Sequence, residues 1–216
     1  MKLIIFGATG PTGQFVVKQA LGKGHHVKAL VRNPDSLTSS NARLSVSKVN
    51  IFRSEELHPH LNGSDAIISC LGTRKLSLFD RSKITFYTDS LQSILDSMRM
   101  SGTKRLVCLS SWGTKRPPVL EKTMRLFPVG RLLDNMLEME VYLEDHCCDI
   151  DYTVIKPAGL LDKAPSGLPI LTSHQERVQG CKMVLSRGDV ARFVLQCVEQ
   201  GTWVKSRVSI GVKTWT

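Results

Sequence analysis

The sequence lacks an apolar run long enough to cross a bilayer. A membrane-spanning helix needs roughly 20 consecutive apolar residues, and no stretch of the 216 residues approaches that length. The opening MKLIIF resembles the start of a secretory signal, but its apolar segment stops at Gly7, short of the about 7–15 residues that such a signal needs. We therefore expect residues 3–6 to form a first core strand, and no membrane among the partners.

The cysteines lack any metal-ligand spacing. The chain has six scattered cysteines: Cys70, Cys108, Cys147, Cys148, Cys181 and Cys197. Without a secretion signal they are expected to be reduced thiols. The sequence therefore predicts a cytoplasmic protein and no metal site.

Aromatic residues are few, at 6% of the chain, while Lys and Arg outnumber Asp and Glu by 29 to 19 for a formal charge of +10. So few aromatics disfavour a stacking platform for single-stranded nucleic acid, and we expect nucleic acid not to be a partner. The excess charge is compatible with a plain solvated basic surface. It is equally compatible with an anionic small-molecule ligand, because such a surface raises the local concentration of anions.

Internal repeats and low-complexity linkers are also missing, and strand and helix patterns alternate from end to end. This alternation predicts one α/β domain over residues 1–216, a Rossmann-like doubly wound parallel sheet with helices on both faces. The expected strands, most of which are unbroken apolar runs, are 3–6, 26–31, 44–50, 65–71, 105–111, 151–155 and 207–211. The expected helices are 12–21, 82–100, 130–146 and 188–199. Segments near 112–130 and 157–187 lack periodicity, and both are expected to be substrate loops or irregular surface excursions.

The most informative motif is GATGPTG at residues 7–13, between the first strand and an amphipathic helix. In a dinucleotide-binding turn Gly7 permits a tight exit from the strand, Gly10 lets the backbone approach a pyrophosphate, and Gly13 lets the helix pack on the sheet. The helix N-terminus offers unpaired N–H groups and a positive dipole end to the phosphates. The strand before and helix after favour this interpretation over a plain chain reversal.

The end of the second strand indicates which dinucleotide binds. NAD-preferring sites carry an acid there for the ribose 2′-OH, whereas this chain has Arg32, a fork of donors suited to a 2′-phosphate. We therefore predict NADPH/NADP as cofactor; the alternative is an ordinary exposed arginine.

Three further strand ends carry candidate site residues, because ligands bind at the carboxyl ends of parallel strands. Asn50 and Ile51 could bond and pack against the adenine, and Gly72 allows close backbone approach, with donors from Thr73 and Arg74. At the fifth strand, Ser111 would lie beside the nicotinamide and polarise an acceptor; a simple turn serine is the alternative.

A Y-x-x-x-K motif at Tyr152–Lys156 matches the catalytic pair of short-chain dehydrogenases, in which the two residues lie one turn apart on a helix. Here the segment has a strand pattern, in which residues four apart are separated by about 13 Å. The lysine could not assist the tyrosine over that gap, so we predict that the motif is not catalytic.

Taken together, these motifs resemble the flavin reductase and biliverdin-IXβ reductase family, atypical short-chain dehydrogenases of the NmrA-like, NAD(P)-binding group. The likeness rests on IFGATGPTG at 5–13, ALVR at 29–32, LGTR at 71–74, the serines at 110–111 and GDVARFVL at 188–195. It implies NADPH-dependent hydride transfer to a flavin, a biliverdin or a similar planar anionic acceptor, by a monomer. The implied catalytic residue is Ser111. The implied cofactor-binding residues are Gly7, Thr9, Gly10, Thr12, Gly13, Arg32, Asn50, Ile51, Leu71, Gly72, Thr73, Arg74, Ser110 and Pro157.

The chain departs from this family at three positions. A second family arginine after Arg32 is replaced by the Asp35-Ser36 neighbourhood, and Asn50 stands where the family has an aspartate. The family's active-site histidine aligns with Ala158, and His174 lies on the loop that follows. The resemblance therefore supports flavin reduction more than biliverdin reduction. A non-catalytic NADP(H)-binding regulator that contacts a partner through the basic segment 114–131 is the alternative; an RNA-binding domain ranks below both.

Overall fold

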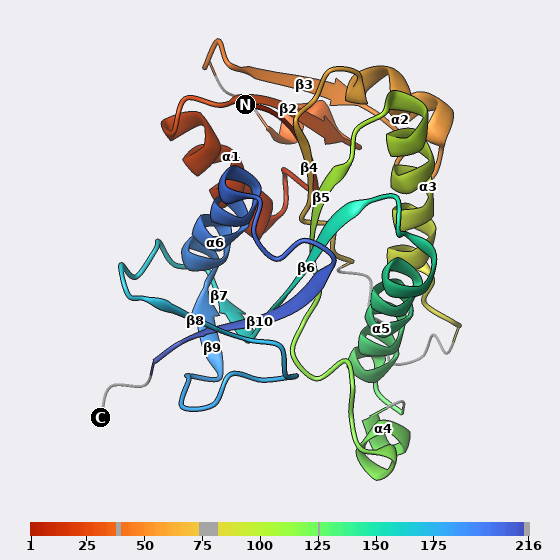
Figure 1. Cartoon of the computed structure of the whole chain (residues 1–216), viewed down its shortest axis with the longest axis vertical. Coiled ribbons are helices and arrows are strands. Elements are labelled where there is room, and N and C mark those ends of the chain that lie inside the picture. Colours follow the sequence, from red (N-terminus) through yellow and green to blue (C-terminus); the bar gives the residue numbers. More distant parts are fainter. Residues whose placement is uncertain (38–39, 74–81, 125, 214–216) are drawn as a thin grey trace.

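An eight-stranded sheet forms the centre of the molecule in a computed structural model, which describes residues 1–37, 40–73, 82–124 and 126–213 (Figure 1). The strand order is β3-β2-β1-β4-β5-β6-β10-β8, parallel except that β8 runs antiparallel to β10. The strands are β1 (Lys2–Phe6), β2 (His26–Val31), β3 (Leu44–Lys48), β4 (Ala66–Ser69), β5 (Arg105–Leu109), β6 (Asp151–Pro157), β8 (Ile170–Ser173) and β10 (Ser206–Val212). The order of the first six is that of a Rossmann fold, which confirms the predicted doubly wound sheet.

Helices cover both faces of this sheet, as Figure 1 shows. One face carries α1 (Pro11–Gly22) and α6 (Arg187–Gln200); the other carries α2 (Ser54–Leu61), α3 (Phe86–Ser101) and α5 (Pro128–His146). The apolar run of β1 explains this arrangement, because successive strand side chains point to opposite faces. Leu3 and Ile5 pack with α1 and α6, whereas Ile4 and Phe6 pack with α2 and α3.

The predicted elements are all present, with shifted ends. The helix expected over 82–100 begins at Phe86, and the strands expected over 44–50 and 65–71 are shorter. The two segments without periodicity contain short elements that were not predicted: α4 (Pro118–Met124), and β7 (Gly159–Leu161) paired with β9 (Val184–Ser186) in a separate two-stranded sheet, besides β8. Within the described ranges, no helix combines the length and apolar character required to span a bilayer.

Candidate functional site

The glycine turn lies at the topological switch point of the sheet, between β1 and β4. Gly7 has φ +71°, and a Cβ added there would lie 2.5 Å from the Cys70 carbonyl oxygen beyond β4. A Cβ at Gly13 would overlap the Gly7 carbonyl group. Both positions therefore require glycine on steric grounds, as the sequence motif predicts, because the turn, the following helix and the neighbouring strand are in direct backbone contact.

The first turn of α1 provides an uncapped helix N-terminus that faces this turn. Gly10 is the extended N-cap residue, its N–H donates to the Gly7 carbonyl at 2.9 Å, and Pro11 begins the helix. This turn of the helix contains no acidic residue and receives no side-chain cap. Unpaired N–H groups, a positive dipole end and side-chain-free glycines fit the diphosphate of a dinucleotide. Thr9 and Thr12 lie in the same segment, half-buried and buried.

Arg32 is exposed directly after β2, next to the switch point. The chain then turns, because the Asn33 side-chain oxygen accepts a hydrogen bond from the Asp35 N–H at 3.3 Å and caps a short 3-10 helix. Among the described residues no carboxylate pairs with Arg32. Its guanidinium is thus available to an anion.

The segment after β3 presents both polar and aromatic groups. The Asn50 side-chain oxygen accepts from the Phe52 N–H at 3.1 Å, and the Asn50 N–H donates to Glu56 at 2.9 Å. Ile51 packs partly against the α2–α3 core, which leaves only its outer part for an adenine. Phe52 is half exposed and stacks edge-on with Phe86 at 6.0 Å. This exposed ring beside Asn50 was not identified from the sequence.

A buried tyrosine supports the segment after β4. Leu71 packs against the core, and the Tyr87 hydroxyl lies 3.9 Å from where a Gly72 Cβ would be. Burial raises the pKa of Tyr87, while a hydrogen bond with the Thr73 backbone acts in the opposite direction. The tyrosine therefore remains a neutral phenol that holds the backbone of residues 72–73. Arg74 lies outside the described residues.

The two serines after β5 have different surroundings. The Ser110 hydroxyl is buried and donates to the Glu140 carboxylate at 2.5 Å. Ser111 is half-buried, and its hydroxyl forms no hydrogen bond within the described residues. The segment is held against β6, because the Ser110 N–H donates to the Ile155 carbonyl at 2.8 Å and the Trp112 N–H to that of Pro157 at 3.0 Å. Pro157 is the buried last residue of β6.

Sequence reasoning missed a buried ionic network behind these serines. Glu140 on α5 is 0% exposed, and it accepts from Ser110, from Thr114 at 3.0 Å and from the Lys156 ammonium at 3.2 Å. Lys156, 2% exposed, also donates to Thr114 at 2.8 Å and to Glu176 at 2.5 Å. The sequence signal that could have indicated this network is a charged residue inside each of two otherwise apolar segments. Glu140 falls on the apolar face of its helix, and Lys156 is the next-to-last residue of the buried strand β6.

Lys156 and Tyr152 lie on β6, so the prediction that the Y-x-x-x-K motif forms a strand is confirmed. Tyr152 packs in the α2–α3–α5 core, and burial raises its pKa. The Lys156 ammonium group instead donates the hydrogen bonds of the ionic network. Its partner Glu176 also accepts from the Lys115 N–H at 3.3 Å, which joins the segments 112–130 and 157–187.

Apolar packing surrounds Ala158, the position that aligns with the family's histidine. Ala158 is buried in a cluster with Trp112 and Val178, and partly buried Cys181 packs against that cluster. His174 packs its ring against Trp203 at 4.9 Å. The Trp112 indole fills space near the alanine, and its N–H has no partner among the described residues.

Cys70 lies against the glycine turn, and Cys108 lies on β5. Burial raises the pKa of Cys70 to about 12, and that of Cys108 to about 12. Both side chains are therefore neutral thiols near neutral pH. Because the thiolate is the nucleophile, neither can serve as a covalent catalyst.

Comparison with known proteins places the chain in a family. The sequence model of the NAD(P)H-binding family matches residues 7–201. The divinyl chlorophyllide a 8-vinyl-reductase of Arabidopsis thaliana, a chloroplastic protein, is 23% identical over 98% of this chain. A photosystem II assembly factor of Trieres chinensis is 27% identical over 92% of this chain.

The chain spans 53% of the length of that reductase and 60% of the assembly factor. In structure it is similar to a Streptococcus pneumoniae protein assigned as an NADH-flavin reductase. The TM-score is 0.76 with 20% identity, covering 99% of this chain and 100% of the other. The glycine turn, the uncapped helix N-terminus and the family match agree, and the chain belongs to the NAD(P)H-binding family.

Proposed function

We propose that the protein is an NADPH-dependent reductase of a planar, anionic acceptor, of the flavin type or a tetrapyrrole such as biliverdin. The observation that carries the proposal is Ser111, whose hydroxyl has no hydrogen-bond partner among the described residues and which follows β5 at the same carboxyl edge of the sheet as the dinucleotide turn, where such folds bind their ligands. NADPH, when bound, supplies the hydride. The vinyl reductase relative and the flavin-reductase-like neighbour support this reaction class.

The chain's own residues would bind and orient the reactants. The turn from Gly7 to Gly13 would hold the diphosphate, and Arg32 the 2′-phosphate. Ser111 would donate its hydroxyl hydrogen to an oxygen or nitrogen atom of the acceptor. A histidine is absent at Ala158, so solvent would complete protonation of the acceptor. Protonation by solvent favours flavins over biliverdin as the acceptor, because reduction of a flavin needs no dedicated acid in the site.

Acceptor reduction is tested by following NADPH absorbance with FMN, riboflavin and biliverdin. We expect turnover with at least one flavin, and a Ser111→Ala variant about two- to tenfold slower, the contribution of one neutral hydrogen bond. Ser110→Ala is the matched control, because that hydroxyl faces Glu140, and it should affect stability more than turnover. Clear NADP binding without turnover of any acceptor would refute the proposal.

The cofactor preference has its own measurement. Arg32→Asp removes a charge-assisted contact worth about 1.5–3 kcal/mol and places a carboxylate where the 2′-phosphate would bind. We expect the ratio of kcat/KM for NADPH over NADH to fall at least tenfold. An unchanged ratio would mean that Arg32 is only a surface charge.

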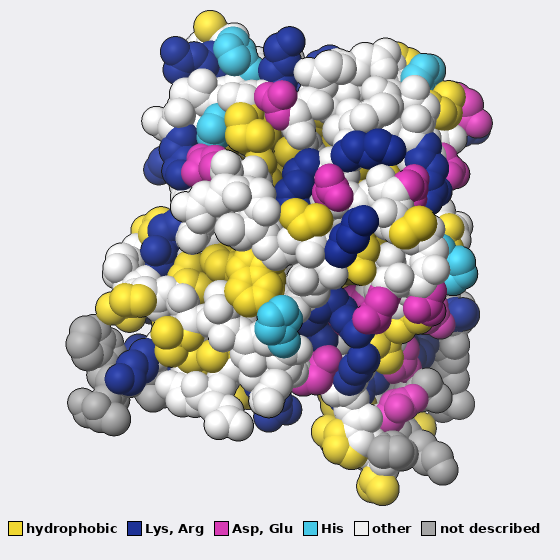
Figure 2. Space-filling view, viewed as in Figure 1, with side chains coloured by type: hydrophobic (Ala, Val, Ile, Leu, Met, Phe, Trp, Pro, Cys, Tyr) yellow, Lys and Arg dark blue, Asp and Glu magenta, His cyan; other side chains and the backbone are white. Residues whose placement is uncertain are grey.

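A second candidate function, a non-catalytic NADP(H)-binding regulator, is favoured by an exposed apolar group on and after α4. Val119 is 80% exposed and Leu126 78%, with Leu120, Phe127 and Val129 also exposed, and Figure 2 shows hydrophobic side chains at this end of the molecule. The photosystem II assembly factors among the relatives support such a role. It predicts NADP binding without turnover in the same assay.

We further propose that the reductase acts as a cytoplasmic monomer. All six cysteines are free thiols, which supports a reducing compartment. Size-exclusion chromatography with light scattering tests the monomer, and a dimer mass would overturn it.

A further inference from the structure

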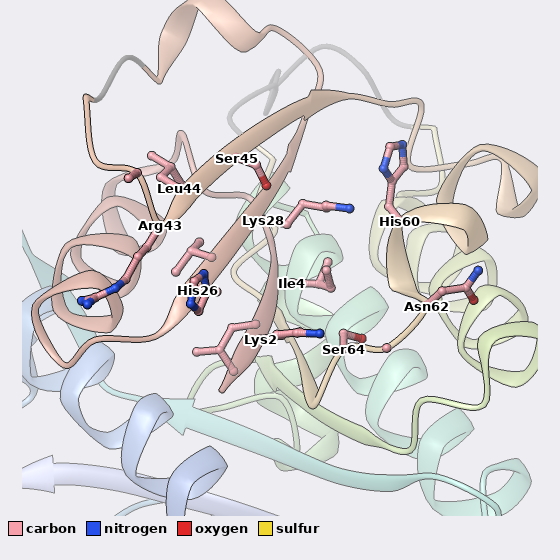
Figure 3. A pocket seen from close by; sticks show the side chains of 14 residues that line it. Lys2, Ile4, His26, Lys28, Arg43, Leu44, Ser45, His60, Asn62 and Ser64 are labelled. Atoms are coloured by element: carbon pink, nitrogen blue, oxygen red, sulfur yellow. The ribbon is translucent and has the colours of Figure 1, made fainter.

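A pocket of ≈ 380 Å³ lies at the opposite end of the strands from the dinucleotide turn (Figure 3). Its walls come from the starts of β1, β2 and β3 and from the end of α2 with the loop that follows. Lys2 begins β1 and Gly7 follows its end. At about 3.3 Å per residue, the five-residue strand separates the two sites by roughly 17 Å.

Every ionisable side chain that lines this pocket is basic: Lys2, His26, Lys28, Arg43 and His60. None of the five forms an ion pair with a carboxylate in the described parts of the chain. Other lysines do, for example Lys23 with Glu199 at 2.7 Å. The neighbouring Asp65 carboxylate accepts the backbone N–H of Lys2 at 2.6 Å. The side chains that line the pocket therefore carry a net positive charge.

Two of these cations point in the same direction. In Figure 3 the Lys2 and Lys28 ammonium groups extend across the sheet toward the side that holds Ser64 and His60, while Arg43 points away. Burial, and then the charge of Lys28, lower the pKa of His60, so the lysine is close enough to act on the ring. A neutral His60 adds one hydrogen-bond donor on the side toward which the two ammonium groups extend.

We propose that this pocket binds a small anion with two or more phosphate groups, independently of the dinucleotide site. Its volume lies within the roughly 300–1,000 Å³ typical of small-molecule pockets. The two cations on this side are ammonium point charges without a guanidinium fork beside them, a set that suits phosphate oxygens rather than planar carboxylates. The two sites are farther apart than the roughly 8 Å over which charges act at physiological salt, so occupation of one should leave the other unchanged.

The test is calorimetric titration of inorganic pyrophosphate into protein saturated with NADP, so that the Gly7–Gly13 turn is already filled. We expect binding, about tenfold or more weakened by Lys28→Gln and unchanged by Lys18→Gln, an exposed position on α1 with the same loss of charge. Citrate, a polycarboxylate of similar charge, should bind more weakly than pyrophosphate.

Four results would overturn the inference. These are no pyrophosphate binding at millimolar concentration, loss of binding on NADP saturation, equal weakening by the two lysine variants, or tighter binding of citrate. Acceptor turnover plays no part in this experiment, so the inference stands or falls separately from the proposed reductase activity.

Discussion

Replacing Lys156 by methionine would leave Glu140 as a buried carboxylate without its nearest cation. In the native protein Glu140 is fully buried, and the remaining charged partner, an Arg207 guanidinium nitrogen, is 3.5 Å away. Breaking a buried pair by removing one member costs about 3–5 kcal/mol, because the other charge stays desolvated. In a protein of this size 1 kcal/mol shifts the Tm by about 2–4 °C. We therefore expect Lys156→Met to lower the Tm by about 6–20 °C.

Urea unfolding followed by far-UV circular dichroism measures this loss. Glu140→Gln keeps an acceptor for Ser110 and Thr114, and Lys156 retains Glu176 at 2.5 Å, so the single glutamine variant should lose less stability. The double variant should be more stable than the sum of the two losses predicts, because it contains no unpaired buried charge. A loss below about 1 kcal/mol for Lys156→Met, which is the range of solvated surface pairs, would refute the argument.

The remaining two predictions concern α6 and the thiols. Burial alone would raise the pKa of Asp189, but hydrogen bonds from Ser166, Ser186 and Arg192 outweigh it and lower the pKa below its usual range. The charged form is therefore favoured in the folded state, and its contribution is present above the unfolded pKa of about 3.9 and lost as pH falls through the folded value. Asp189→Asn should cost about 1.5–3 kcal/mol near pH 7 and much less below pH 3; an equal cost at both pH values in urea titrations would contradict this. Cys148 is exposed, whereas burial raises the pKa of Cys70 and Cys108 to about 12 each, so a disulfide-exchange reagent at pH 8 should label Cys148 first and these two only in denaturant. Labelling of Cys70 in the native protein at the rate of Cys148 would show that the turn opens.

Much of the fold was predictable because most strands of the large sheet are rich in apolar residues and each large helix has an apolar stripe. Elements without such patterns were missed. Helix α2 buries only Leu57 and Leu61 and contains Pro59, so its eight residues carry little helical signal. Strands β7 and β9 are three residues each and depend on pairing with each other across 22 intervening residues, which no local pattern indicates.

The candidate site was predictable where it depends on backbone geometry and not where it depends on tertiary packing. Gly13 is required by its contact with the Gly7 carbonyl within the motif, and Gly7 has the positive φ of +71° that the tight turn needs, so the motif spacing indicates both positions. The partner of Ser110 could not be read from the sequence, because Glu140 is 30 residues away on α5. Nor could the indole of Trp112 be placed beside Ala158, since 46 positions separate them and their contact depends on how the segment after β5 lies on β6.

The consecutive residues 110–112 after β5 have different surroundings, and the hydrogen bonds of this segment to β6 explain the difference. The N–H groups of Ser110 and Trp112 both bond to β6 carbonyls, which holds the segment extended, and successive side chains therefore point in opposite directions. Ser110 turns inward to the buried carboxylate of Glu140, so Ser111 must face away from that network. The Ser110 N–H bond to Ile155 keeps the backbone from which Ser111 projects in place even without the Ser110 hydroxyl, so Ser110→Ala should lower stability while Ser111→Ala slows turnover.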